Sequence, residues 1–398
     1  MDEIYLTIFF ICLLLFLLGS GVWVALSMVA VSAIGMMLFT SRPVGDAMAT
    51  TIWGTSSSWS LTALPLFVWM GEILFRTKLS ENLFKGLSPW LSKLPGGLIH
   101  VNVVGCALFA AISGSSAATV ATVGKMSIPE LRKRKYPERI LLGSLAGSGT
   151  LGLLIPPSII LIIYGVTIED SIAKLFMAGI LPGIMIALIF MSYVVIWSIL
   201  NKKLMPKNLQ NFSFSQKIKA SKQLFPVILL IGSVIGSIYT GVATATEAAS
   251  LGVVGALILS WLQQTLNRKT FKLSLLGATK TSCMIAFILA GSTFLSLAMG
   301  FTGLPRNLAI WINNMNLSPF MLIFILTIFY IILGMFLDGI SAVVLTMAII
   351  EPMIRQAGFD MIWFGIYLVI VVEMAQITPP VGFNLFVLQG MANRDMAF

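Results

Sequence analysis

The residues best suited to chemistry in this chain lie in two polar interruptions of apolar sequence. The first, "SGSS" at 113–116, supplies serine hydroxyls, and the second, "DGIS" at 338–341, supplies the carboxylate of Asp338. Double prolines interrupt two further apolar runs, at 156–157 and 379–380. Proline has no N–H, so carbonyls before it lose their helical partners. Hydroxyl, carboxylate and free carbonyl oxygens together are ligands for a hard cation such as Na⁺.

We therefore predict two Na⁺ sites, each formed by one polar tip and one unwound helix. The first is predicted to use Ser113, Ser115, Ser116, Gly149 and Thr150. The second is predicted to use Asp338, Gly339, Ser341, Gln376 and Thr378. The substrate is expected beside Ser116, Pro156, Pro157, Pro379 and Pro380. The alternative is that these small residues and prolines only allow close helix packing, as small residues often do in membranes.

The elements that position these residues are apolar helices. The chain has 398 residues, of which 58% are hydrophobic and only 10% charged, against about 25% in soluble domains. Apolar stretches of about 20 residues recur along it, which predicts an all-α polytopic protein in a lipid bilayer. The net charge of +10 is explained by basic cytoplasmic loops, so no nucleic-acid partner is expected.

The two halves of the chain repeat. At an offset of 223 residues, Pro156-Pro157 falls on Pro379-Pro380 and Pro129 on Pro352, which indicates duplication. Residues 98–130 and 319–353 are each too long for a straight span and carry the polar breaks at 110–122 and 336–346. We expect them to be re-entrant hairpins, although a long tilted helix with a serine patch is the alternative.

Charge sets the orientation of the repeats. If both hairpins return to the side they came from, one face holds all of the 25 Lys and Arg residues except Arg42, Lys174, Arg306 and Arg355. This asymmetry satisfies the positive-inside rule and makes the repeats inverted, with two proline-broken helices. Inverted repeats with broken helices are typical of secondary transporters. The carbonyls of residues 150–155 are then expected to be free for Na⁺.

The repeat also predicts the division of the chain. Scaffold and arm occupy 1–97 and 224–317, transport parts occupy 98–200 and 318–398, and 201–223 is a cytoplasmic linker. The twin of the span 174–200 would fall at about 397–423, beyond Phe398, so we expect the final helix to be missing from this sequence. Of the acids within or near spans, Glu72 is expected at the interface and Glu373 beside the second Na⁺ site.

Several motifs together resemble one family: "ALPLF" (63–67), "LPGGL" (94–98), "AAISGSSAATVATVG" (110–124), "IPEL" (128–131), "LGLLIPPSIILIIYG" (151–165) and "TPPVGFNLFVLQG" (378–390). In order and spacing they resemble the large membrane subunit of the tripartite ATP-independent periplasmic (TRAP) transporters. The resemblance implies an elevator-type sodium symporter in the bacterial inner membrane. It also implies a small four-helix membrane partner and a periplasmic binding protein that delivers an organic acid.

Three other functions compete with this interpretation. An intramembrane enzyme would need a catalytic set, which His100, the only histidine, and one mid-membrane aspartate do not provide. A channel would need no pair of opposed hairpins. A proton-coupled organic-anion transporter of similar fold is the closest rival, and its separation from a sodium symporter requires measurement.

Overall fold

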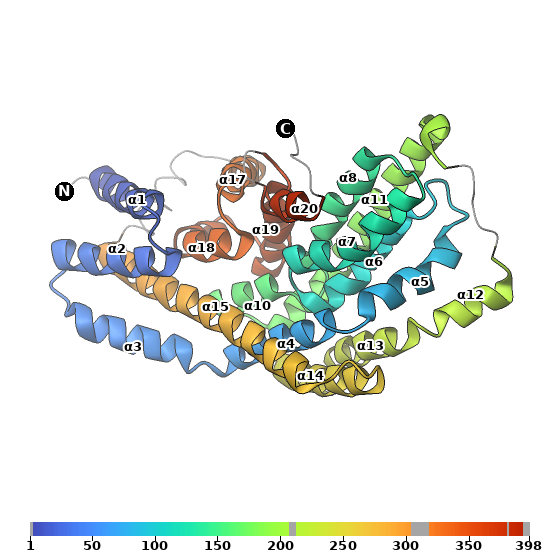
Figure 1. Ribbon diagram of the computed structural model, residues 1–398. Helices are drawn as coiled ribbons and strands as arrows, with labels where there is room; N and C mark the ends of the chain where they lie inside the picture. Colours follow the sequence, from blue (N-terminus) through green and yellow to red (C-terminus); the bar gives the residue numbers. More distant parts are fainter. Residues whose placement is uncertain (1–2, 207–211, 304–317, 380–381, 393–398) are drawn as a thin grey trace.

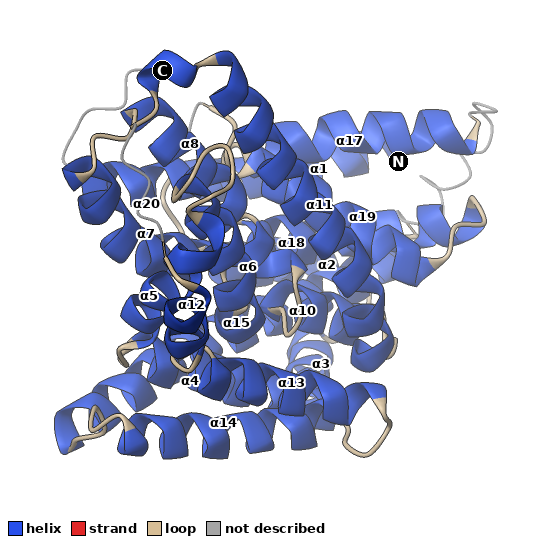
Figure 2. Ribbon diagram, turned by 90° about the vertical axis from the view of Figure 1, so that its right-hand side faces the viewer, coloured by secondary structure: helices blue, strands red, loops and turns tan. Residues whose placement is uncertain are grey.

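Helices form every regular element of the part of the chain that the structure describes. The computed structural model describes residues 3–206, 212–303, 318–379 and 382–392 (Figures 1 and 2). The all-helical class predicted from the sequence is therefore confirmed for these residues. By length and composition, five described helical stretches are able to cross a membrane, or seven if each of two bent helix pairs counts as one span.

The first repeat begins with apolar helices and an amphipathic arm. Its elements are α1 (Glu3–Gly19), α2 (Val24–Phe39), α3 (Val44–Ser56), the 3-10 helix η1 (Trp59–Thr62), α4 (Ala63–Phe75) and α5 (Leu79–Leu91). The chain bends by 53° between α3 and the η1–α4 stretch. The amphipathic helix α5 follows within the segment 1–97, which was predicted to hold scaffold and arm.

The first predicted hairpin is present as two packed helices, α6 (Ile99–Ser113) and α7 (Ser116–Lys133). The polar break is shorter than predicted, because only residues 114 and 115 are non-helical. With 15 residues, α6 measures about 22 Å, which is short of the ~30 Å hydrocarbon core. That length suits a helix that enters the membrane and turns back, and re-entrance itself stays a prediction.

The first proline-broken helix is also present. It consists of α8 (Glu138–Gly149), α9 (Leu151–Leu154) and α10 (Ile159–Thr167), and the long helix α11 (Ile172–Leu200) follows. Residues 155–158 form the break, and both prolines in it are buried. The core continues through α10, whose residues 159–165 are all buried, so the break lies inside the protein and not against lipid.

The predicted linker at 201–223 contains structure of its own. It holds the 3-10 helix η2 (Lys202–Leu204) and the helix α12 (Phe214–Ser221). The arm helix α5 packs on α12 through Trp90, whose indole N–H donates to the Ser221 hydroxyl (2.8 Å). The ammonium group of Lys217 lies 5.3 Å from the centre of the Trp90 ring. The linker is therefore fastened to the arm of the first repeat.

The second repeat follows the same order. It contains α13 (Phe225–Tyr239), α14 (Ala245–Leu262), α15 (Arg268–Thr302), the second hairpin α17 (Pro319–Gly334) and α18 (Gly339–Gln356), and the second broken helix α19 (Met361–Ala375) and α20 (Phe383–Ala392). Residues 304–317, at the end of the predicted scaffold and arm segment 224–317, lie outside the described residues. The predicted hairpin and proline break are both found at the positions that the 223-residue offset requires.

The helices form two layers that meet at the hairpin tips. In both views α3, α4, α13 and α14 lie together along one side, the lower edge, and α15 runs beside α4 (Figures 1 and 2). The two hairpins and the broken helices lie above this layer. The division of the chain into scaffold and transport parts, and the movement of one against the other, stay predictions.

Candidate functional site

The tip of the first hairpin is a tight turn fixed by serine hydroxyls. Gly114 ends α6 with φ +57°, a left-handed conformation that glycine adopts without strain. Ser115 caps α7 by accepting an amide hydrogen bond from the first turn. The hydroxyls of Ser113 and Thr119 are 2.8 Å apart, and Thr119 donates to the Ser115 carbonyl (2.8 Å). These bonds hold the tip in one shape.

The tip packs directly on the first broken helix. A Cβ atom added to Gly152 of α9 would lie 2.7 Å from both the Ser115 carbonyl oxygen and the Ser116 Cα atom. Beyond the break, the amide of Ile159 donates to the Gly114 carbonyl (3.4 Å). Gly152 is therefore the point of closest approach, one turn beyond the predicted Gly149.

Not all the carbonyls expected to be free are free. The helix continues to Leu154, and the amide of Ile155 donates to the Leu151 carbonyl (3.0 Å). The Leu153 carbonyl accepts from the Ser158 hydroxyl. The prediction of free carbonyls across 150–155 is thus wrong at residues 151 and 153. The reason is that the prolines at 156 and 157 remove the N–H donors only for the carbonyls of residues 152 and 153, four residues earlier. The Ser158 hydroxyl then takes the place of the missing donor at Leu153.

The tip of the second hairpin has the same helix cap as the first, with a carboxylate in place of a hydroxyl. Asp338 caps α18 by accepting from the Ser341 amide (3.1 Å), as its twin Ser115 caps α7. A Cβ atom added to Gly339 would lie 2.5 Å from Nε2 of Gln376, which follows the end of α19. Gln376 is only 2% exposed. The second tip therefore meets the second broken helix as the first tip meets its own.

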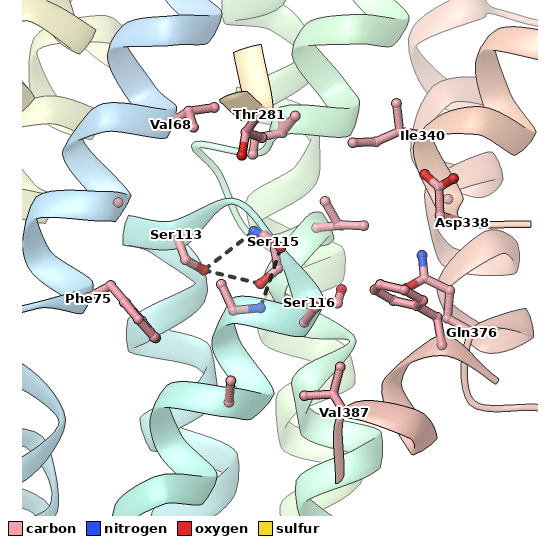
Figure 3. Close-up of a pocket in the computed structure, with 18 of the residues that line it drawn as sticks. Val68, Phe75, Ser113, Ser115, Ser116, Thr281, Asp338, Ile340, Gln376 and Val387 are labelled. Carbon is pink, nitrogen blue, oxygen red and sulfur yellow. Dashed lines mark hydrogen bonds between the residues drawn. The ribbon is translucent and has the colours of Figure 1, made fainter. Parts of the chain in front are cut away.

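Both tips border one cavity of about 630 Å³. Figure 3 shows the three serines of the first tip facing Asp338 and Gln376 across it. Its polar lining residues are Glu72, Ser113, Ser115, Ser116, Thr281, Asp338 and Gln376. No Lys, Arg or His is among the lining residues, all of which belong to the described part of the chain. Most of the remaining lining residues are apolar, so the cavity has an apolar wall that carries a few oxygen-bearing side chains, two of them acidic.

The predicted site residues divide into two groups. Those that line the cavity are Ser113, Ser115, Ser116, Asp338, Gly339 and Gln376. Those that lie behind it, among the described residues, are Gly149, Thr150, Ser341 and Thr378. Gly149 packs on Val120 of α7, and the Thr150 hydroxyl donates to the Gly147 carbonyl (2.6 Å). Ligation of Na⁺ by either group stays a prediction.

The prolines predicted to contact the substrate do not line the cavity. Pro156 and Pro157 are buried between the first tip and α11, since a Cβ atom at Gly114 would lie 3.0 Å from the Pro157 carbonyl oxygen and one at Gly179 would lie 3.4 Å from Pro156. Pro379 is exposed, and Pro380 lies outside the described residues. In this structure the described prolines shape the breaks without touching the space between the tips.

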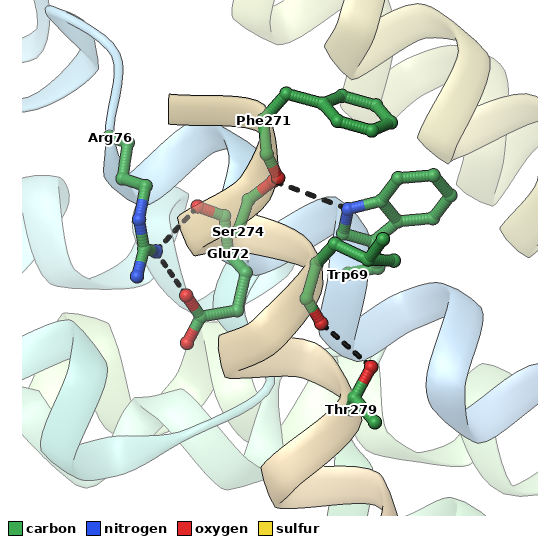
Figure 4. A network of polar contacts seen from close by, with 7 residues as sticks. Trp69, Glu72, Arg76, Phe271, Ser274 and Thr279 are labelled. Carbon is green, nitrogen blue, oxygen red and sulfur yellow. Dashed lines mark hydrogen bonds and ion pairs between the residues drawn. The ribbon is translucent and has the colours of Figure 1, made fainter. Parts of the chain in front are cut away.

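The scaffold wall of the cavity contains residues that the sequence analysis did not place there. Glu72 of α4, expected at the interface, lines the cavity and forms an ion pair with Arg76 (Figure 4). Gly277 of α15 makes room for it, because a Cβ atom there would lie 2.6 Å from the carboxylate. Trp69 joins the same helices by donating to the Ser274 hydroxyl (3.3 Å). The spacing of Trp69, Glu72 and Arg76, which places them on one face of α4, was the only sign in the sequence that they act together.

Comparison with known proteins decides the family. Residues 10–397 match the family described as tripartite ATP-independent periplasmic transporter, DctM component. The chain belongs to this family. The resemblance drawn from the sequence motifs is therefore confirmed, and so is the expectation that the chain is no enzyme, because TRAP large permeases are membrane transport proteins.

Individual relatives agree over nearly the whole chain. The C4-dicarboxylate TRAP transporter large permease protein DctM of Pseudomonas aeruginosa is 33% identical over 365 residues, covering 92% of this chain and 84% of that protein. The isethionate TRAP transporter permease protein DctMQ of Oleidesulfovibrio alaskensis is 31% identical over 387 residues, covering 96% of this chain and 59% of that protein.

One solved structure shares the fold. It is that of the YdaH transporter of Alcanivorax borkumensis, with a TM-score of 0.60 and 13% identity, covering 94% of this chain and 90% of that one. At this identity the likeness concerns the arrangement of helices alone. It supports the fold class of this TRAP permease and carries nothing about its substrate.

Proposed function

We propose that this TRAP permease imports a small organic anion by sodium symport. The observation that supports the proposal best is the matched pair of hairpin tips, capped by Ser115 and Asp338, that bring hydroxyl and carboxyl oxygen atoms to one cavity. Na⁺ takes oxygen ligands, and each tip with its broken helix offers hydroxyl, carboxyl or carbonyl groups. The proposed Na⁺ sites remain those assigned from the sequence.

The acidic side chains of the cavity would repel an anionic substrate unless bound Na⁺ offset their charge. Asp338 has no ion-pair partner among the described residues, and no basic side chain lines the space. The Asp338 carboxylate and a substrate anion about 5 Å away would repel each other by roughly 3 kcal/mol at an effective dielectric constant of 20. Bound Na⁺ would remove this repulsion, so cations bind before the anion. The N-termini of α7 and α18, at the cavity edge, then attract the substrate anion.

The substrate class follows from the relatives and the cavity. The two relatives described above are named for C4-dicarboxylates and isethionate, which are small organic anions. A cavity of about 630 Å³ has room for such a molecule with its cations and some water. A carboxylate or sugar acid is therefore the proposed cargo.

Sodium dependence is the test that separates this proposal from a proton-coupled transporter of similar fold. In proteoliposomes with the complete system, we expect an inward Na⁺ gradient to drive accumulation of the organic anion. Replacement of Na⁺ by K⁺ should reduce uptake to background, while a pH gradient without Na⁺ should drive none. Accumulation driven by the pH gradient alone would favour the proton-coupled alternative.

The proposed partners are a small four-helix membrane subunit and a periplasmic binding protein, at the bacterial inner membrane. The family description calls the system tripartite and periplasmic, which supports this assignment. We expect negligible uptake of free substrate by this chain alone, and restored uptake once the cognate binding protein and the small subunit are added. Strong uptake of free substrate by the isolated chain would contradict the partner assignment and leave sodium symport untouched.

A further inference from the structure

One buried carboxylate joins the two repeats and is not among the residues predicted to form the two Na⁺ sites. Glu373, in the last turn of α19, is only 3% exposed, and its Oε1 atom accepts a hydrogen bond from the Ser116 hydroxyl (2.7 Å). Ser116 begins the second helix of the first hairpin. This bond therefore connects the first tip to the second broken helix, across 257 residues of sequence.

The other carboxylate oxygen has no partner. Oε2 of Glu373 is buried without a hydrogen bond, and no described basic residue forms an ion pair with this side chain. A buried carboxylate is costly unless something compensates its charge. The single hydroxyl of Ser116 satisfies one of its several acceptor positions. The carboxyl group therefore needs either a proton or a bound cation to compensate its charge.

A second unpartnered side chain lies near the same helix end. Asn384, at the start of α20, is fully buried, and neither its Oδ1 nor its Nδ2 atom has a hydrogen-bond partner. Its backbone amide donates to the carbonyl of Gln376 (3.2 Å), which follows Glu373 by three residues, about one helical turn. The break in the second helix thus has a buried side chain with an unused oxygen atom on each side of it, Glu373 at the end of α19 and Asn384 at the start of α20.

We propose that Glu373, Ser116 and Asn384 hold a third Na⁺ ion between the first hairpin and the second broken helix. The inference rests on the proposed sodium symport and adds a site to it. Carboxylate, hydroxyl and carboxamide oxygens are the ligands that hard cations use. Neither Glu373 nor Asn384 lines the cavity, whereas Ser116 does, so this position lies directly behind the cavity wall at the first tip.

The third site has no counterpart in the first repeat. At the 223-residue offset Glu373 corresponds to Thr150, whose hydroxyl is already bonded to the Gly147 carbonyl. The site therefore breaks the symmetry of the two tip sites. A bound cation would add ligand bonds to the Ser116–Glu373 hydrogen bond and so strengthen the connection between the first hairpin and the second repeat.

The test counts bound Na⁺ in the purified full-length chain. Equilibrium binding of radioactive Na⁺ is measured for the wild type, Glu373→Gln, Asp338→Asn and the control Glu351→Gln, whose carboxylate pairs with Arg355 (2.9 Å) away from the cavity. Glu373→Gln keeps the size of the side chain and an acceptor for Ser116. We expect it to bind one Na⁺ fewer than the wild type, and the control to bind the same number.

Thermal unfolding supplies a readout that a purely structural role would not change. In K⁺ medium without Na⁺, Glu373→Gln should be at least as stable as the wild type, because the substitution removes an uncompensated buried charge. Addition of Na⁺ should raise the midpoint of the wild type by more than that of the variant. Asn384→Ala should weaken Na⁺ binding at one site at least tenfold, as an independent check on the same site.

The outcomes separate this inference from the proposed function. If Glu373→Gln binds as many Na⁺ ions as the wild type, with the same stabilisation, the third site is wrong and sodium symport stands. If the wild type binds no Na⁺ at all, both ideas are wrong. Loss of one Na⁺ in Glu373→Gln, with an unchanged control, supports the third site.

Discussion

Asp338→Asn should reduce sodium-driven uptake by roughly ten- to a hundredfold, because interactions with a charged group contribute about 1.5–3 kcal/mol. Asp338 provides the carboxylate of the proposed second Na⁺ site and lines the cavity. Asparagine caps helices about as well as aspartate, so α18 should still begin at Gly339. The substitution removes the charge and keeps the cap, which assigns the loss to cation binding.

A matched control exists in the same half of the chain. Asp360 caps α19 by accepting from the Trp363 amide (2.8 Å), but it is exposed and does not line the cavity. Asp360→Asn should therefore transport at nearly the wild-type rate. Uptake and its Na⁺ dependence are measured for both variants in proteoliposomes. Wild-type uptake by Asp338→Asn, with unchanged Na⁺ dependence, would show that the second site is misplaced.

The hairpins and their caps could be predicted because local sequence determines them. A serine or aspartate that directly precedes an apolar run favours the start of a helix, because its side chain accepts a hydrogen bond from an amide of the first turn. The 223-residue offset then relates Ser115 to Asp338, and the structure gives both residues the same capping role. The proline breaks were equally local, because a missing N–H acts on the residues directly before it.

The contacts across the site could not be predicted, because they join residues far apart in sequence. Glu72 was expected at the interface, and the sequence did not show that Gly277 of α15 leaves space for its half-buried carboxylate. Glu373 was expected beside the second Na⁺ site, and its hydrogen bond to Ser116 at the first tip was not foreseen. A lone acid in an apolar run indicates a function but not its partner.

The exact placement of the first break shows a further limit. Sequence placed free carbonyls from residue 150 onward, but α9 continues the helix to Leu154. Which carbonyls lose a partner depends on the four-residue spacing of helical bonds and on the local replacement by Ser158. The contact between the tip and the broken helix was predicted at Gly149 but lies one turn further along, at Gly152. A substitution at Gly152 therefore tests the packing of the site.

Gly152→Ala should cut sodium-driven uptake while most of the protein remains folded. The added Cβ atom would lie 2.7 Å from the Ser115 carbonyl oxygen, the Ser116 Cα atom and the Thr119 hydroxyl, and the first two belong to backbone that cannot turn aside. Overpacking of this kind costs about 1–3 kcal/mol, enough to lower the population of molecules in which the first tip is packed on α9 by roughly five- to 150-fold. The tip must then move away from α9.

The control for this change is Gly143→Ala, on α8 of the same broken helix. Gly143 is exposed, and a Cβ atom there meets nothing within 4 Å, so alanine should stabilise the helix slightly and leave uptake unchanged. Uptake and Na⁺ affinity are measured for both variants. Because displacement of the tip separates Ser115 and Ser116 from α9, Gly152→Ala should weaken Na⁺ binding as well as transport. Normal Na⁺ affinity with normal uptake would mean that the contact between tip and broken helix does not form the first site.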